Sequence, residues 1–121
     1  MMIHSNRLER EANIWLATTR PDGRPHLVPI WFVWHDQEIY ILTTLSTVKA
    51  KNLLANPRAS VALESGSQPV IAECTARPVQ APYSGDLAAA FQRKYEWDIT
   101  QDAEYNGLFA LTPHKWLTWS A

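Results

Sequence analysis

The sequence predicts a mainly β protein: a small antiparallel barrel of six or seven strands with short helices between them. Three observations lead to this fold class. The chain has 121 residues, the length of a single domain, so we expect one domain over residues 1–121. Apolar runs typical of strands recur along it, most of them in hairpin order and separated by turn signals. Strands packed this densely in a short chain favour an antiparallel barrel.

The first half of the chain is predicted to hold three strands between two short helices. A turn at Arg20–Arg24 joins the first two strands, because Pro21 presets its first corner and Gly23 can take a positive φ. The second helix ends at Asn56-Pro57, because the residue before proline avoids helical geometry. In order, the elements are a helix at Ile3–Glu11, strands at Asn13–Thr19, His26–Trp34 and Glu38–Thr44, and a helix at Thr47–Ala55.

The strand predicted at His26–Trp34 is almost wholly apolar. A strand with one face in water alternates apolar and polar residues, and this run does not. We therefore expect both of its faces to be covered, one by the core and the other by a partner subunit or a ligand. Pro29 lacks an amide donor, which predicts a bulge or a locally unpaired edge at that point.

The second half is predicted to hold the remaining strands around one longer helix. Leu87, Phe91 and Tyr95 recur at helical spacing, and this places the helix at Tyr83–Tyr95. The other elements are strands at Arg58–Glu64 and Val70–Gln80, an irregular acidic segment at Glu96–Asn106, and closing strands at Gly107–Thr112 and Lys115–Ser120 on either side of Pro113.

Composition and missing motifs argue against several functional classes. The net charge of −1 does not favour binding to nucleic acid or to an anionic membrane. The N-terminus is polar and no apolar stretch approaches the roughly 20 residues of a membrane span, so we expect a cytoplasmic protein. The glycines form no dinucleotide fingerprint or P-loop, and the histidines lack metal-ligand spacing. The single cysteine, Cys74, is expected to be a small buried apolar residue.

The segment Thr43–Asn52 is the most informative one, because a strand ends there in hydroxyl residues and a helix begins. Ser46 or Thr47 can cap that helix, and a helix N-terminus presents free amide donors and a partial positive charge that favour phosphate. The alternative is an ordinary capped helix with solvated lysines. The side chains of the predicted phosphate cradle are Thr43, Thr44 and Lys49.

Two aromatic segments offer walls for a flat ligand. The run Pro29–Phe32 combines an apolar strand with a proline, which gives a flat wall and free backbone groups; the alternative is an ordinary core strand. The C-terminal run Trp116–Trp119 either closes the barrel or supplies a tryptophan that covers a cofactor across a dimer interface. The first run and the cradle lie on consecutive strands of one hairpin, which is the layout that a phosphorylated flavin needs.

Short motifs follow one another in a fixed order along nearly the whole chain. They are Leu16–Thr18, Asp22–His26, Pro29–Val33, Ile39-Tyr40, Thr43, Lys49, Asn52-Leu53, Asn56–Arg58 and Val61–Leu63. In this order and spacing the chain resembles the pyridoxamine 5′-phosphate oxidase-like FMN-binding split barrels. The F420-dependent subgroup of that family is similar in two further segments, Lys94–Ile99 and Thr112–Trp119.

The resemblance implies a homodimer with an FMN or F420 cofactor held at the subunit interface. Thr43 and Lys49 would then hold the phosphate, and Pro29, Ile30 and Trp31 would line the ring. The remaining cofactor contacts implied by the resemblance are Thr44, Ser46 and Lys51 near the ribityl-phosphate arm, Gln68 at a position that reaches the cofactor in some relatives, and Trp116 as a lid.

Three departures argue against pyridoxamine phosphate oxidation. His26 stands where the true oxidase has an arginine, Val48 replaces a basic residue beside the lysine, and the chain ends at Ala121 without an arginine-rich segment. The choice between FMN and F420 stays open. F420 carries an acidic oligoglutamate tail, for which Lys49, Lys51 and Arg58 are available.

The expected function is that of an FMN- or F420-dependent oxidoreductase acting on a small conjugated substrate. The cofactor would carry the hydride chemistry and the protein would supply orientation and a dry pocket. No side chain is assigned as a general acid or base, because nothing in the sequence indicates a tuned pair. The alternative is a non-enzymatic carrier of flavin, F420 or haem, or a redox-sensing module.

Overall fold

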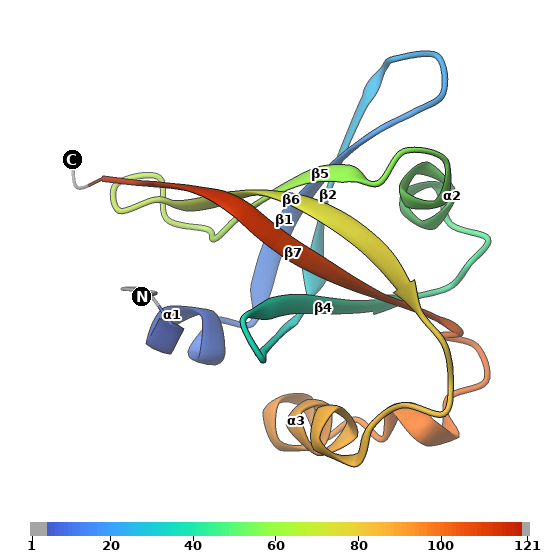
Figure 1. The fold of residues 1–121 in the computed structure, drawn as a ribbon. Helices are drawn as coiled ribbons and strands as arrows, with labels where there is room; N and C mark the ends of the chain where they lie inside the picture. The colour runs from blue at the N-terminus through green and yellow to red at the C-terminus, as the bar shows by residue number, and fades with distance from the viewer. Residues whose placement is uncertain (1–4, 120–121) are drawn as a thin grey trace.

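The computed structural model describes residues 5–119, which form eleven elements arranged around one curled sheet (Figure 1). Ile3, His4 and Ser120, at the ends of two predicted elements, lie outside the described residues. The elements are α1 (Ser5–Arg10), β1 (Asn13–Thr19), β2 (Pro25–Trp31), β3 (Val33–His35), β4 (Glu38–Thr43), α2 (Val48–Ala55), β5 (Arg58–Ala62), β6 (Val70–Val79), α3 (Gly85–Tyr95), the 3-10 turn η1 (Ile99–Gln101) and β7 (Gly107–Thr118).

Within residues 5–119 the strands form one seven-stranded sheet in the order β2-β1-β5-β6-β7-β4-β3. Every neighbouring pair in it is antiparallel. The first and last strands of this order, β2 and β3, are consecutive in the chain, so the sheet curls round until its two edges are joined by one residue. This confirms the predicted mainly β split barrel with short helices. No helix among the described residues is long and apolar enough to cross a membrane.

The predicted continuous strand at His26–Trp34 is wrong, because the chain breaks at Phe32. β2 pairs with β1 on one side of the barrel, and β3 pairs with β4 on the other. One straight strand cannot reach both partners, so the chain turns between them. Phe32 itself is completely buried in the barrel core, which explains why the run reads as uniformly apolar.

The backbone groups exposed by this break are satisfied by the hydroxyl of Tyr95, the last residue of α3. It accepts a hydrogen bond from the Phe32 N–H at 2.9 Å. It also lies 2.7 Å from the Phe32 carbonyl oxygen and 2.8 Å from that of Ala12, and shares its single proton between them. Burial raises the pKa of Tyr95 to about 12, so the hydroxyl keeps that proton. Tyr95 therefore joins α3 to the break at Phe32, where the two edges of the sheet meet; we call this break the seam of the barrel.

Of the two alternatives predicted at Pro29, the structure shows the unpaired edge and no bulge: Pro29 lies opposite Trp15 in an unbroken register, and β2 is an edge strand. The predicted break at Pro113 is wrong, because β7 runs unbroken. The register with β6 shifts beside it, where Glu73 pairs with Lys115 and Cys74 with Pro113, so His114 is skipped. Within the described sheet, β7 pairs with β4 only as far as Leu111, so one edge of β7 is free at Pro113.

The strand β4 is buried on both faces, which divides the core in two. Ile39 and Ile41 face the barrel interior, where they pack in the main core cluster. Tyr40 and Leu42 face outward and pack against α3 residues such as Phe91 in a second cluster. In Figure 1, α3 accordingly lies beside β4. Cys74 is buried in the main cluster, as predicted, and burial raises its pKa to about 12.

We expect Tyr95→Phe to lower the free energy of unfolding by about 1–3 kcal/mol, because it leaves the N–H and carbonyl of Phe32 without their partner. Chemical denaturation followed by tryptophan fluorescence measures this change. Tyr83→Phe is the matched control, since among the described residues the Tyr83 hydroxyl has no hydrogen-bond partner. Equal losses in the two variants would contradict the role given to the Tyr95 hydroxyl.

Candidate functional site

A pocket of about 700 Å³ opens where β2, the end of β4, the start of α2 and the segment after α3 meet. It brings together strands from the two sides of the seam at Phe32. Its other walls come from Asn13, Leu42 and Thr47. Six of the predicted site residues line it: Pro29, Ile30, Trp31, Thr43, Thr44 and Lys49.

The hydroxyl end of this pocket is organised by Thr47, which caps α2 in place of the alternative, Ser46. Its hydroxyl donates to the Thr44 carbonyl oxygen at 2.7 Å and lies 3.4 Å from the Ala50 N–H, from which it accepts. The Thr43 hydroxyl is 3.3 Å away. The amides of Val48 and Lys49 precede the first intrahelical hydrogen bond of α2, so they are available to an anion.

The charge at this end is positive. Burial lowers the pKa of Lys49, and among the described residues no carboxylate acts against it. Burial also lowers the pKa of His26, with smaller contributions from Arg20 and Lys49 nearby. The His26 Nδ1 atom is buried without a hydrogen-bond partner within residues 5–119. The partly buried Lys49 ammonium has no counter-ion among the described residues and is stabilised by an arriving anion, so this donor set suits a phosphate group, whereas the lowered pKa of His26 favours its neutral form.

The loop between β4 and α2 is held against the loop that precedes β7. The Thr44 hydroxyl donates to the Glu104 carbonyl oxygen at 3.2 Å, and the Leu45 N–H donates to the Asn106 side chain at 2.9 Å. Gly107 allows this close approach, because a Cβ atom there would lie 2.7 Å from Leu45 Cδ2. These contacts therefore hold the Thr43–Thr47 end of the pocket against the acidic segment that precedes β7.

The opposite wall is aromatic, and the sequence did not indicate it as part of a site. Trp31 stacks on Tyr95, with ring centroids 4.4 Å apart and planes 7° apart. Trp97 meets Trp31 edge-on at 6.1 Å and Tyr105 at 5.3 Å. The lining residues missed by sequence reasoning are Tyr95, Glu96, Trp97, Asp102 and Tyr105. The signal available for them was the density of aromatic and acidic residues in the segment predicted to be irregular.

Four predicted site residues do not line this pocket. Ser46 is exposed in the loop before α2. Lys51 lines a neighbouring groove of about 430 Å³ with Arg20 and Arg24. Gln68 lies in the turn between β5 and β6, where its carbonyl oxygen accepts from Arg7 at 2.9 Å. Trp116 packs edge-on against Trp34 at 6.0 Å. The cofactor contacts expected of these four residues stay predictions.

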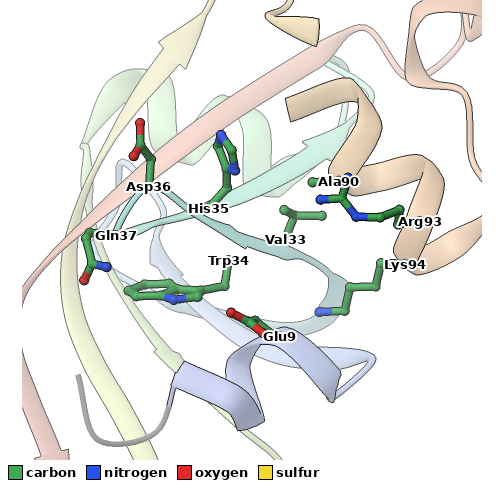
Figure 2. A pocket seen from close by; sticks show the side chains of 9 residues that line it. All are labelled: Glu9, Val33, Trp34, His35, Asp36, Gln37, Ala90, Arg93 and Lys94. Carbon is green, nitrogen blue, oxygen red and sulfur yellow. The ribbon is translucent and has the colours of Figure 1, made fainter. Parts of the chain in front are cut away.

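A second cleft, of about 560 Å³, lies between α1, β3 and α3, on the other side of the seam (Figure 2). Lys94 reaches into it, donates to the Leu8 carbonyl oxygen at 3.2 Å and sits 3.8 Å from the centroid of the Phe32 ring. Burial lowers the pKa of Lys94 to about 8, against the opposing effect of Glu11 and Glu9. In the view of Figure 2, the Glu9 side chain lies between the Trp34 ring and the Lys94 side chain. The contacts of Lys94 tie α1 to the barrel.

The outer face of β1 and β2 is apolar and open. Paired neighbours on this face are Trp15 with Pro29 and Ala17 with Leu27. Leu27 is 62% exposed, Trp31 is 48% exposed and Trp15 is 39% exposed. The face that the sequence predicted to be covered by a partner or ligand is therefore uncovered in the single chain. An exposed apolar patch of this kind marks an interaction surface.

The fold resembles several solved structures. The heme storage protein HutZ from Vibrio cholerae matches with a TM-score of 0.81 and 19% identity over 95% of this chain and 92% of that chain. An F420 reductase matches with a TM-score of 0.77 and 22% identity over 97% and 98%. The conserved hypothetical protein Rv2991 from Mycobacterium tuberculosis matches with a TM-score of 0.78 and 26% identity over 99% and 86%.

The sequence itself is matched by a family model. A search of the curated proteins finds no significant match. The model described as pyridoxamine 5′-phosphate oxidase, however, matches residues 4–120, which is nearly the whole chain. The seven-stranded split barrel agrees with the fold expected from the resemblance. The chain belongs to the pyridoxamine 5′-phosphate oxidase family.

Proposed function

We propose that this chain is an oxidoreductase that holds a phosphorylated flavin-type cofactor, FMN or F420, in the 700 Å³ pocket and acts on a small conjugated substrate. One observation carries the proposal. The pocket joins a phosphate-type donor set on α2 to a flat apolar wall on β2. A phosphorylated tricyclic ring system requires both in one cavity.

The residues present fit such a group. The threonine hydroxyls, the first amides of α2 and the Lys49 ammonium would hold the phosphate, and the wall at Pro29–Trp31 would lie against the ring. When bound, the cofactor supplies hydride transfer. The chain's own residues bind and orient it, and the aromatic wall excludes water from the ring. No side chain in the pocket is assigned as an acid or base.

The groove beside the pocket favours F420 over FMN. Its cations are Arg20, Arg24 and Lys51, and its one carboxylate, Asp22, is paired with Arg24 at 2.8 Å. An acidic tail that left the phosphate end would meet uncompensated positive charge there. The likeness to an F420 reductase agrees with this choice, and the open groove gives the tail room.

The functional unit proposed is a homodimer. The patch on β1 and β2 would be covered by a second copy, and Trp31 belongs both to that patch and to the pocket. A cofactor in the pocket would then lie at the subunit boundary. Gln68 and Trp116, which do not line the pocket of their own chain, would approach the cofactor of the partner.

The alternative is a non-enzymatic carrier of flavin, F420 or haem, or a redox-sensing module. The likeness to the heme storage protein HutZ favours it at the level of the fold. Within the described chain, the lining residues of the pocket include no histidine, cysteine or methionine, and of their two tyrosines the Tyr95 hydroxyl is already bonded to Phe32, which leaves Tyr105 as the haem ligand available. Tight cofactor binding without reduction or oxidation of any acceptor would favour the carrier.

We expect Lys49→Ala to weaken cofactor binding by about 1–3 kcal/mol, or about 5- to 150-fold in Kd, because it removes a charge-assisted contact to phosphate. Fluorescence titration with FMN and with F420 measures this. Arg93→Ala, which removes an exposed cation from the second cleft, is the control and should leave Kd unchanged. Failure of the unaltered protein to bind either cofactor at micromolar concentration would overturn the proposed function.

The identity of the cofactor is tested by Lys51→Glu. We expect this variant, in which a negative charge replaces a positive one, to bind F420 at least about fivefold more weakly, since each of the two units of charge contributes up to about 1 kcal/mol at the surface, and FMN with little change. The same titration is repeated at high salt, where the difference should shrink. Equal weakening of both cofactors would show that the groove does not hold an acidic tail.

The dimer is tested by Leu27→Lys, which places a charge in the centre of the patch. We expect the variant to sediment as a folded monomer, because a buried unpaired charge disfavours the interface. Glu64→Lys, a charge change at an exposed position outside the patch, is the control. A monomeric unaltered protein at micromolar concentration would contradict the interface.

A further inference from the structure

The two ends of the 700 Å³ pocket carry opposite charge. Lys49 is the one lysine or arginine among the lining residues of the described chain, and it belongs to α2. The two carboxylates that line the pocket, Glu96 and Asp102, belong instead to the segment that follows α3. The aromatic end of the pocket is thus electrically distinct from the phosphate-binding end.

Two carboxylates stand at the aromatic end. Asp102 accepts the Trp97 indole N–H at 2.9 Å and the backbone N–H groups of Glu104 and Tyr105 at 3.1 and 3.0 Å. These bonds, led by the one from Tyr105, lower the pKa of Asp102 and keep it ionised. The carboxylate is therefore fixed in place beside the Trp97 ring.

Glu96 is the second carboxylate, and no cation of the described chain pairs with it. It is exposed, lines the pocket and forms no ion pair with any residue between 5 and 119. It adopts a left-handed conformation with φ of 53° as the C-cap of α3, so the chain turns there before Trp97, which also lines the pocket. The C-terminal end of an eleven-residue helix adds further negative potential at this point.

The aromatic rings here are also more exposed than a structural cluster requires. Trp31 is 48% exposed although Tyr95 covers one of its faces, and Tyr105 is 40% exposed. The exposure of Trp31 belongs in part to the patch on β1 and β2, so the exposed ring that is particular to this end is that of Tyr105. Open π faces beside fixed negative charge attract cations through two effects that add together.

We propose that this acidic, aromatic end recognises a planar, positively charged group, such as a protonated or N-alkylated nitrogen heteroaromatic ring. The inference rests on the proposed function and gives its substrate class: the conjugated substrate carries a positive charge on its ring. This end repels anionic groups, since the carboxylate of Asp102 is held in place and Glu96 has no cation of the described chain to neutralise it. Glu96 and Trp97 are the residues that determine this specificity.

The test compares two tricyclic probes of similar size, N-methylacridinium and acridine-9-carboxylate. Their binding to the full chain is followed by fluorescence anisotropy at low salt after loading with FMN or F420, which occupies the Lys49 end; the chain without cofactor is measured alongside, and there the comparison is between the Glu96 variant and the unaltered protein. We expect the cation to bind at least tenfold more tightly than the anion. Equal binding of the two probes would overturn the inference.

The matched variants are Glu96→Gln and Glu64→Gln, both at exposed positions. We expect Glu96→Gln to weaken binding of the cation about three- to fivefold and to strengthen or leave unchanged that of the anion. Glu64→Gln, which lies outside the pocket, should alter neither. Equal loss in both variants would mean that only the overall charge of the protein matters, and would count against the proposal.

Titration of FMN and F420 into the same samples separates this inference from the proposed function. If the chain binds neither cofactor but still discriminates between the probes through Glu96, the proposed function fails and the cation site stands. If the chain binds a cofactor and does not discriminate between the probes, the proposed function stands and this inference alone fails.

Discussion

The seam of the barrel at Phe32 is the constraint on which the other features of this protein depend. A sheet that closes through one residue must leave the backbone of that residue without a strand partner, and a buried unpaired amide is costly. Tyr95 meets this need with one hydroxyl, which reaches both polar groups of Phe32. Because Tyr95 ends α3, the same contact determines where that helix stops and where the following segment starts.

The pocket and the second cleft both follow from this arrangement. Trp31, just before the seam, stacks on Tyr95 and forms a wall of the pocket. Val33, just after the seam, lines the cleft on the other side together with Lys94, the neighbour of Tyr95. Trp31 and Val33 would share one face in a continuous strand, so the break at Phe32 is what lets one junction supply walls to two cavities. Glu96 and Trp97 reach the pocket because the chain turns sharply at the helix end that Tyr95 holds.

The two ends of the proposed site differ in how the chain assembles them. The phosphate-type donors are local: they come from one strand end and one helix start, only a few residues apart, and Thr47 organises them. The acidic and aromatic end is assembled from distant segments, with Trp31 beside Trp97 and with the loop after Thr43 tied to Asn106. Because the two ends of the pocket carry opposite charge, a phosphate and a cation would bind at different ends.

The sequence by itself determined the strand-rich fold class and the capped helix that follows the strand end at Thr43, because hydrophobic periodicity, capping and turn chemistry act over a few neighbouring residues. It misread the strand through Phe32 and the run through Pro113, since a strand's partners are chosen by residues far away in the chain. Only the tertiary structure brought Tyr95, Glu96 and Trp97 to the pocket. Long-range contacts of this kind leave no local pattern, because they depend on the closure of the whole barrel.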